Sequence, residues 1–212
     1  MKKHIVCFGD SNTHGYCADP GDNADGGNRF NEDERWTCRL QKALGEAYLV
    51  TEEGLSGRTT VFQDPIHESM DGLSAIYSVL KSHEPVDLLV IMLGTNDTKE
   101  RFCANAPTIG KGMERLVTKA KTVNCWGGKK PNILIVAPPA IQEGFFDPVM
   151  GDDCREKSLA TAQYLQEAAR NTGCHFMDAE GCEFNAIDHM HLTCAGHKEL
   201  AHRLASLIPQ LV

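Results

Sequence analysis

The chain has 212 residues, of which 42% are hydrophobic, 7% aromatic and 24% charged, the ordinary composition of a globular protein. A chain of this length suits one domain, and it can bury roughly 70% of its unfolded surface without disulfides or a structural metal. Its formal net charge of −8 argues against a nucleic-acid or anionic-membrane partner, because both attract clustered lysine and arginine.

Cysteine usage and the amino-terminal segment bear on the cellular compartment. The nine cysteines lie singly and form no CxxC pair, unlike the even count of a secreted disulfide framework. The segment MKKHIVCFGDS has an apolar run too short for the core of a signal peptide. No stretch approaches the roughly 18–20 apolar residues of a membrane span. We therefore expect a soluble, reduced protein of the cytoplasm.

Short apolar runs alternate with longer helix-like segments along the chain. The predicted strands are 4–8, 48–51, 87–93, 132–137 and 175–177. The predicted helices are 35–44, 71–83, 108–123, 153–171 and 193–208, and a polar surface loop is expected over 19–31. Gly45 and Pro85 end the first two helices, and Thr193 is the expected N-cap of the last.

Five strands separated by helices predict right-handed βαβ crossovers and a parallel sheet covered on both faces. We expect a single domain over 1–212, a three-layer α/β/α sandwich with a five-stranded parallel sheet in the flavodoxin-like strand order 2-1-3-4-5. Such a sheet binds its ligand outside the carboxyl ends of the strands, at the switch between strands 1 and 3. Residues that carry chemistry should therefore follow these strands.

Four polar blocks occupy the expected positions. They are GDSN at 9–12, GLSGR at 54–58, GTND at 94–97 and DHMHLT at 188–193. A serine hydroxyl is a weak nucleophile that needs a histidine base held by a carboxylate, which Ser11, His191 and Asp188 can provide. The oxyanion of a tetrahedral intermediate needs hydrogen-bond donors. The candidates are the N–H groups of Ser11 and Gly57 and the side-chain amide of Asn96.

In this order and spacing the blocks resemble the GDSL or SGNH hydrolase family of esterases and lipases. IVCFGDSNTHG, RWT, EEGLSGRTT, VIMLGTNDTK and DHMHLT further resemble its arylesterase/acyltransferase branch, and the resemblance extends from Ile5 to the final helix. It implies a Ser11 nucleophile, a triad completed by Asp188 and His191, and Gly57 and Asn96 as oxyanion donors. It also implies small-acyl aryl or alkyl esters as substrates, acyl transfer to alcohols, no cofactor or metal, and assembly into a homo-oligomer.

Two positions depart from the family pattern. Many members have an asparagine shortly before the second-block glycine, where this chain has Glu52 and Glu53. Relatives in the branch often have Leu-Thr-Trp after the serine, where this chain has Asn12-Thr13-His14. The preference for acyl group or alcohol is therefore not carried over.

Several residues beside the site have structural interpretations. We expect Asp10 to brace the turn or cap a helix, and Asp97 to hold the GTND loop. A salt bridge from Arg58 to Glu52 or Glu53 is favoured over binding of a substrate carboxylate. Ser11, taken alone, is also a plausible helix N-cap.

A zinc site is the competing interpretation of the last block. His189, His191, Cys194 and His197 are suitable ligand types. However, no CxxC or HExxH motif accompanies them, and Asp188 already accounts for His191. We expect no metal, and we expect His197 to cap or pack near the active-site loop.

Two other functions stay open. A carbohydrate O-deacetylase shares the same chemistry, although the absence of a visible export signal weighs against a polymer substrate. A flavodoxin-like module would hold a phosphate in the GDSNTHG loop, but the chain has no GxGxxG or GxxxxGK motif. That module also leaves Asp188 and His191 unexplained. The apolar residues around 145–150 suit either an acyl pocket or a subunit interface.

Overall fold

The computed structural model describes residues 1–212 and contains one five-stranded parallel sheet in the order β2-β1-β3-β4-β5. The strands are β1 (Lys3–Gly9), β2 (Tyr48–Gly54), β3 (Leu88–Met92), β4 (Ile133–Ala137) and β5 (His175–Asp178). The predicted strand order is confirmed. β2 extends three residues beyond the prediction, because Glu52, Glu53 and Gly54 continue the pairing with β1. Its side chains are only partly buried at the edge of the sheet, so the strand can carry polar residues that apolar periodicity does not detect.

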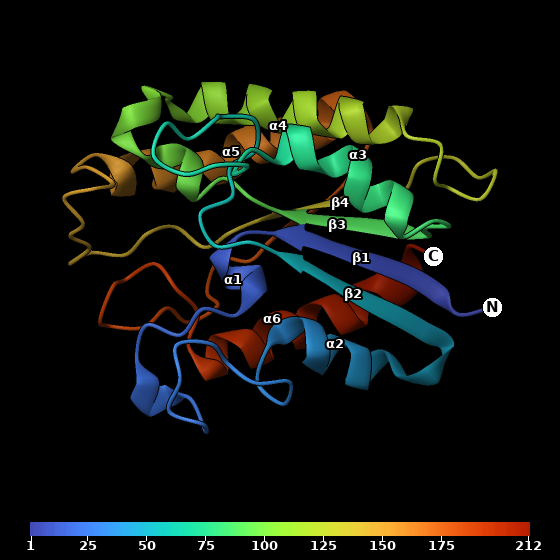
Figure 1. Ribbon diagram of the computed structural model, residues 1–212, viewed down its shortest axis with the longest axis horizontal. Coiled ribbons are helices and arrows are strands. Elements are labelled where there is room, and N and C mark those ends of the chain that lie inside the picture. Colours follow the sequence, from blue (N-terminus) through green and yellow to red (C-terminus); the bar gives the residue numbers. More distant parts are fainter.

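Helices cover both faces of the sheet and form the predicted three layers (Figure 1). α3 (Gly72–Ser82), α4 (Ala106–Thr122) and α5 (Cys154–Thr172) lie on one face, and α2 (Trp36–Leu44) and α6 (Cys194–Leu207) lie on the other. The short α1 (Ser11–His14) lies directly after β1. Single 3-10 turns occupy Pro20–Asp22, Gly45–Ala47, Asn96–Thr98, Glu100–Phe102 and Ile208–Gln210.

Side-chain caps begin several of these helices. Thr193 caps α6 as predicted, with its hydroxyl accepting from the backbone N–H of Gly196 at 3.0 Å. α4 begins two residues before the predicted start because Asn105 caps it and Pro107 suits the first turn. The start of α4 is therefore set by its capping residue, which apolar periodicity does not reveal.

Side chains of β3, the central strand of the sheet, alternate between the two faces. Leu89 and Ile91 pack with α3, α4 and α5, whereas Leu88, Val90 and Met92 pack with α2 and α6. This alternation explains why the whole strand is apolar, since both of its faces are buried.

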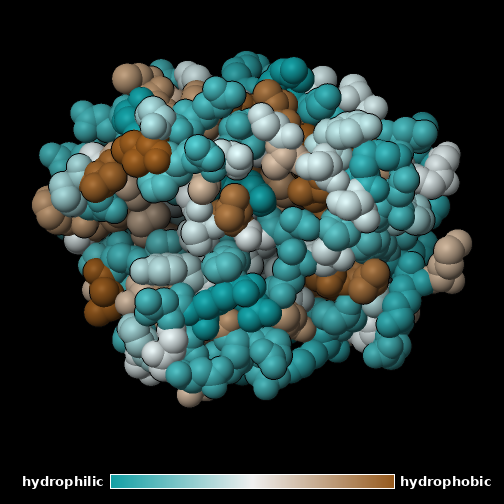
Figure 2. All heavy atoms as spheres, viewed as in Figure 1, coloured by the Kyte–Doolittle hydropathy of each residue, from teal (hydrophilic) through white to brown (hydrophobic).

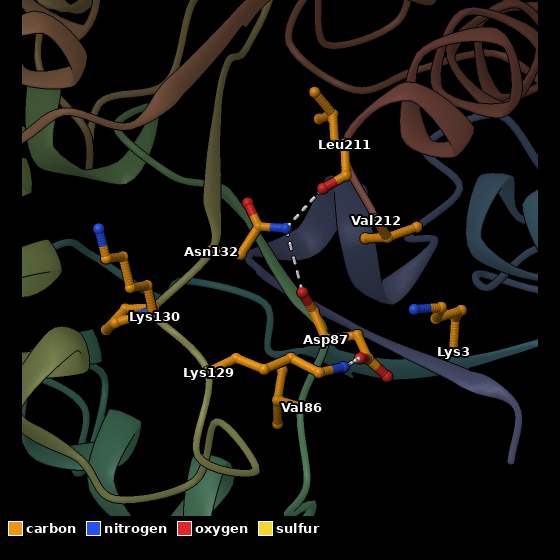
Figure 3. Close-up of a pocket in the computed structure, with 9 residues that line it drawn as sticks. Lys3, Val86, Asp87, Lys129, Lys130, Asn132, Leu211 and Val212 are labelled. Carbon is orange, nitrogen blue, oxygen red and sulfur yellow. Dashed lines mark hydrogen bonds and ion pairs between the residues drawn. The ribbon is translucent and has the colours of Figure 1, made fainter.

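The amino ends of the strands carry a hollow of about 400 Å³, close to both chain termini (Figure 1 and Figure 3). Several of its polar groups pair with one another. Lys129 contacts the Asp87 carboxylate, and the Asn132 amide donates to the carbonyl oxygens of Leu211 and Asp87 at 2.8 and 3.1 Å. None of the four polar blocks lines this hollow, so the predicted chemistry belongs to the opposite end of the sheet.

Candidate active site

The turn after β1 positions Ser11. A Cβ on Gly9 would lie 2.0 Å from the Thr13 hydroxyl oxygen, so glycine is needed for the turn to fold back onto the strand. Asp10 caps α1 by accepting a hydrogen bond from the backbone N–H of Asn12 at 3.0 Å. The predicted capping role of Asp10 is confirmed. The alternative that Ser11 is the N-cap is wrong, because Ser11 is the first residue inside the helix.

Three of the predicted side chains form one chain of hydrogen bonds. The hydroxyl oxygen of Ser11 lies 2.8 Å from Nε2 of His191, and Nδ1 of His191 lies 2.6 Å from Oδ2 of Asp188. If Nδ1 donates to the carboxylate, Nε2 is free to accept from the serine hydroxyl. Ser11 and His191 are 6% and 8% exposed, so the contact is largely shielded from water.

The other carboxylate oxygen of Asp188 is also occupied. It accepts from the Asn185 side-chain amide at 2.9 Å and from the backbone N–H groups of Met190 and His191 at 3.1 and 3.2 Å. Burial by itself raises the pKa of Asp188, but the hydrogen bonds, led by the one from His191, lower it overall. The carboxyl group is therefore ionised at neutral pH.

Sequence reasoning missed Asn185. Its side-chain oxygen accepts from the backbone N–H groups of Ile187 and Asp188 at 2.8 and 2.9 Å, so it organises the turn that carries Asp188. Asparagine commonly binds the backbone two residues ahead in this way. The Asn-x-x-Asp spacing was the available signal.

The candidate oxyanion donors come from the loops after β2 and β3. Gly57 has a φ of +91°, which favours glycine, and its backbone N–H makes no hydrogen bond within the chain. The Asn96 amide nitrogen lies 3.2 Å from the carbonyl oxygen of Arg58 and 3.4 Å from Oδ2 of Asp10. The fold thus brings Asn96 beside the turn of Ser11.

Asp10 and Asp97, the two neighbours of Asn96, are both buried. Asp97 accepts from the backbone N–H of Thr60 at 2.9 Å and contacts its hydroxyl, which ties the loop after β3 to the loop after β2. The expectation that Asp97 holds its loop is confirmed. Burial raises the pKa of Asp10 and of Asp97 to about 6. Lys99 and Arg58 are nearby cations that partly oppose the shift at Asp10.

The predicted salt bridge of Arg58 is wrong. The guanidinium is buried, lies 4.2 Å from the centre of the Phe8 ring and donates to the carbonyl oxygens of Gly9, at 3.0 Å, and Glu53. These carbonyls lie where two strands end. The Glu52 carboxylate pairs instead with Arg35, whose Nε and Nη2 atoms each lie 2.9 Å from one of its oxygens.

His197, one of the four ligands of the zinc interpretation, is occupied in the core. His197 is fully buried, its Nδ1 accepts from the backbone N–H of Trp36 at 3.3 Å, and its ring centre lies 4.9 Å from that of Phe30. Burial lowers the pKa of His197 to about 3. The predicted packing role of His197 is confirmed. No group of three or more His, Cys, Asp or Glu side chains is arranged to hold a metal ion.

Several exposed apolar side chains lie on the loops that follow the carboxyl ends of β2, β4 and β5. Figure 2 shows brown, apolar spheres on the side of the molecule that carries these loops, as well as elsewhere on this face. We call the exposed apolar side chains of these loops the apolar rim: Leu55, Ile66, Phe146, Val149 and Ile187. The loop that carries two of them is joined to the loop of Asp188, because the Gln142 N–H donates to the carbonyl oxygen of His189 at 2.9 Å.

Comparisons with known proteins agree with this fold. The sequence model of the GDSL-like lipase/acylhydrolase family matches residues 7–199. An aryl esterase from M. smegmatis is 35% identical, with a TM-score of 0.89 over 99% of this chain and 100% of that one. A carbohydrate acetylesterase from Sinorhizobium meliloti is 33% identical, with a TM-score of 0.89 over 100% of each chain.

A third similar structure is a putative arylesterase from Agrobacterium tumefaciens, 32% identical, with a TM-score of 0.86 over 99% of this chain and 100% of that one. No curated protein matches the chain. The fold and these comparisons define a carboxylic ester hydrolase of the SGNH fold. The chain belongs to the GDSL-like lipase/acylhydrolase family. None of its helices is long and apolar enough to cross a membrane.

Proposed function

We propose that the chain is a single catalytic domain over 1–212 that hydrolyses small-acyl aryl or alkyl esters through a serine acyl-enzyme. The observation that carries the proposal is the continuous contact from Ser11 through His191 to Asp188, with distances of 2.8 and 2.6 Å. Both lie within the reach that proton transfer requires, about 2.6–3.2 Å.

Acylation begins when the Ser11 oxygen attacks the ester carbonyl carbon. Nε2 of His191 takes the hydroxyl proton, and the Asp188 carboxylate stabilises the imidazolium that forms. The carbonyl oxygen becomes an oxyanion, which accepts hydrogen bonds from the N–H groups of Ser11 and Gly57 and from the Asn96 amide. Collapse of the intermediate breaks the ester C–O bond.

His191 then gives its proton to the departing alcohol, leaving the acyl group on Ser11. Water attacks the acyl-enzyme while His191 accepts its proton, and a second collapse releases the carboxylic acid and the free serine. If an alcohol replaces water, the same steps transfer the acyl group to that alcohol. This sequence of steps uses no cofactor or metal.

The apolar rim supports aryl or alkyl esters as the substrate class. Its residues lie on loops that follow the strand ends, two of which also carry Gly57 and Asp188, and exposed apolar groups there offer contact area to an apolar leaving group or acyl chain. A carbohydrate O-deacetylase is the second candidate, favoured by the similarity to a carbohydrate acetylesterase. The homo-oligomer and the cytoplasmic location stay predictions.

Hydrolysis of p-nitrophenyl acetate by wild type and Ser11→Ala tests the mechanism. We expect kcat to fall by roughly 10⁴–10⁶ in the variant, as in serine-triad deletions. Mass spectrometry after treatment with a serine-directed phosphonate should find one adduct, on Ser11. An unchanged rate in Ser11→Ala would exclude the proposed nucleophile.

Substrate class is tested by comparing kcat/KM for phenyl acetate and for an acetylated monosaccharide. The double variant Phe146→Ser/Ile187→Ser should lower the value for the aryl ester by about tenfold, the usual scale of a lost apolar contact. Leu159→Ser is the matched control, since Leu159 is an exposed apolar residue on α5, outside the rim. Faster turnover of the sugar ester, unaffected by the double variant, would favour the deacetylase.

A further inference from the structure

Asn12 joins the turn of the nucleophile to the loop of the histidine. Its side chain is 1% exposed and reaches a segment nearly 180 residues away in the sequence. The amide nitrogen donates to the carbonyl oxygen of Met190 at 3.2 Å, and the amide oxygen accepts from the backbone N–H of Leu192 at 2.9 Å. These two residues flank His191.

This pair of bonds has one workable orientation. Turning the amide over would place its nitrogen against the Leu192 N–H and its oxygen against the Met190 carbonyl, so both bonds would be lost. The backbone carbonyl of Asn12 is held as well, because it accepts from the Trp36 indole N–H at 3.1 Å. Asn12 is therefore fixed at both its backbone and its side chain.

The polar contacts of Asp188 do not join the histidine loop to α1, as those of Asn12 do. Asp188 and Asn185 bind His191 from within its own loop, so they orient the ring but leave the distance from that loop to α1 undetermined. Asn12 is adjacent to Ser11 and binds on both sides of His191. The Tyr16 ring, whose centre lies 4.6 Å from that of His191, adds an apolar contact without a directional bond.

We propose that Asn12 is a positioning residue that sets the contact between Ser11 and His191 by clamping the histidine loop to α1. The inference rests on the proposed function. A leucine, the residue that often follows the serine in the arylesterase branch, cannot make either bond. This chain therefore holds its histidine with a directional polar clamp at a position where an apolar side chain supplies packing alone.

Steady-state kinetics of Asn12→Leu and Asn12→Asp with p-nitrophenyl acetate test the clamp. Asn12→Leu loses both bonds and leaves a buried N–H and a buried carbonyl unpaired. Asn12→Asp keeps an acceptor for Leu192 but sets a carboxylate oxygen against the Met190 carbonyl. We expect kcat to fall at least tenfold in both variants while KM changes less than about threefold, because the proton transfer is misaligned and the ester-binding surface is retained.

Asn132→Leu is the matched control. Asn132 also binds two backbone groups far apart in the sequence, but it lies at the opposite end of the sheet (Figure 3). It should lose stability without losing kcat. If Asn12→Leu does not fold, Asn12→Asp provides the comparison. A wild-type kcat in the folded Asn12 variants would overturn the clamp.

A double-mutant cycle separates the clamp from general loosening of the structure. If Asn12 acts through His191, adding Asn12→Leu to His191→Ala should lower the residual rate less than twofold. Losses that add fully would overturn the proposal. Failure of the proposed function is distinguished by Ser11→Ala: retained activity there rejects the nucleophile, whereas activity lost there with normal Asn12 variants rejects the clamp alone.

Discussion

His197 shows at the scale of one residue how burial changes the chemistry of a side chain. Burial lowers its pKa in the folded protein to about 3, against 6.5 for an ordinary histidine. The unfolded chain therefore takes up a proton near pH 6.5, whereas the folded chain does so near pH 3. The stability that comes from the neutral ring is present above pH 6.5 and is lost as pH falls toward 3.

His197→Asn removes this titration while its side-chain oxygen can still accept from the Trp36 N–H. The free energy of unfolding should then depend less steeply on pH between 6.5 and 3, by about 1.4 kcal/mol per pH unit. Urea unfolding of both proteins at a series of pH values measures the difference. Parallel curves would show that His197 does not titrate differently on folding.

We expect the Asn96 amide to stabilise the oxyanion that forms in the transition state. Asn96→Ala should lower kcat for p-nitrophenyl acetate by about 10²–10³, the usual cost of one lost oxyanion donor. Asn105→Ala, which removes the cap of α4, is the control and should lower the melting temperature while kcat stays normal. Equal kcat values for the two variants would remove Asn96 from the oxyanion site.

At the scale of elements, the close approach of α1 to β2 sets the position of Ser11, the proposed nucleophile. A Cβ on Gly54 would lie 2.1 Å from the backbone nitrogen of His14 and 2.5 Å from the carbonyl carbon of Thr13. Both are backbone atoms of α1, so space for a Cβ would open only if the backbone of α1 moved away.

Gly54→Ala should therefore destabilise the protein by about 1–3 kcal/mol and lower kcat, because Ser11 moves with the turn. Gly27→Ala is the control, since its added Cβ would meet nothing closer than 3.9 Å. Denaturant unfolding and ester turnover of the two variants give the comparison. A Gly54→Ala protein with normal stability and normal turnover would contradict this account.

Periodicity predicted the long elements and missed the short ones. The five long helices bury apolar residues at helical spacing, and β1, β3 and β4 bury continuous apolar runs, both of which are visible in the sequence. α1 has only four residues, about one helical turn, so it is too short to show an apolar periodicity. The start of α4 depends on one side chain, Asn105, whose bond to the Thr108 N–H is a local detail that apolar spacing does not reveal.

The whole molecule has two cores on either side of one sheet, and each contains one of the two tryptophans. Trp36 packs with α2 and α6, and Trp126 packs with the cluster under α3, α4 and α5. Successive residues of β1, β3 and β4 alternate between the two cores, so each of these strands belongs to both. We therefore expect the chain to unfold as one cooperative unit.

Trp36→Phe and Trp126→Phe leave one fluorescent probe in each core. Within each variant, the urea transition followed by tryptophan fluorescence should coincide with the loss of helix followed by circular dichroism. Two separated transitions would show that the layers unfold independently and would contradict a single domain over 1–212.

The sequence by itself determined the strand order, the three layers and the blocks that lie at the carboxyl ends of the strands. These follow from apolar periodicity and from the rules of parallel crossovers, which act along the chain. The tertiary structure alone decided the partners of Arg58 and Glu52 and the contact of Asn12 with the histidine loop. Such partners are chosen by which donors and acceptors the fold leaves unpaired within hydrogen-bond reach, and residues nearly 180 positions apart come within that reach only in the folded protein.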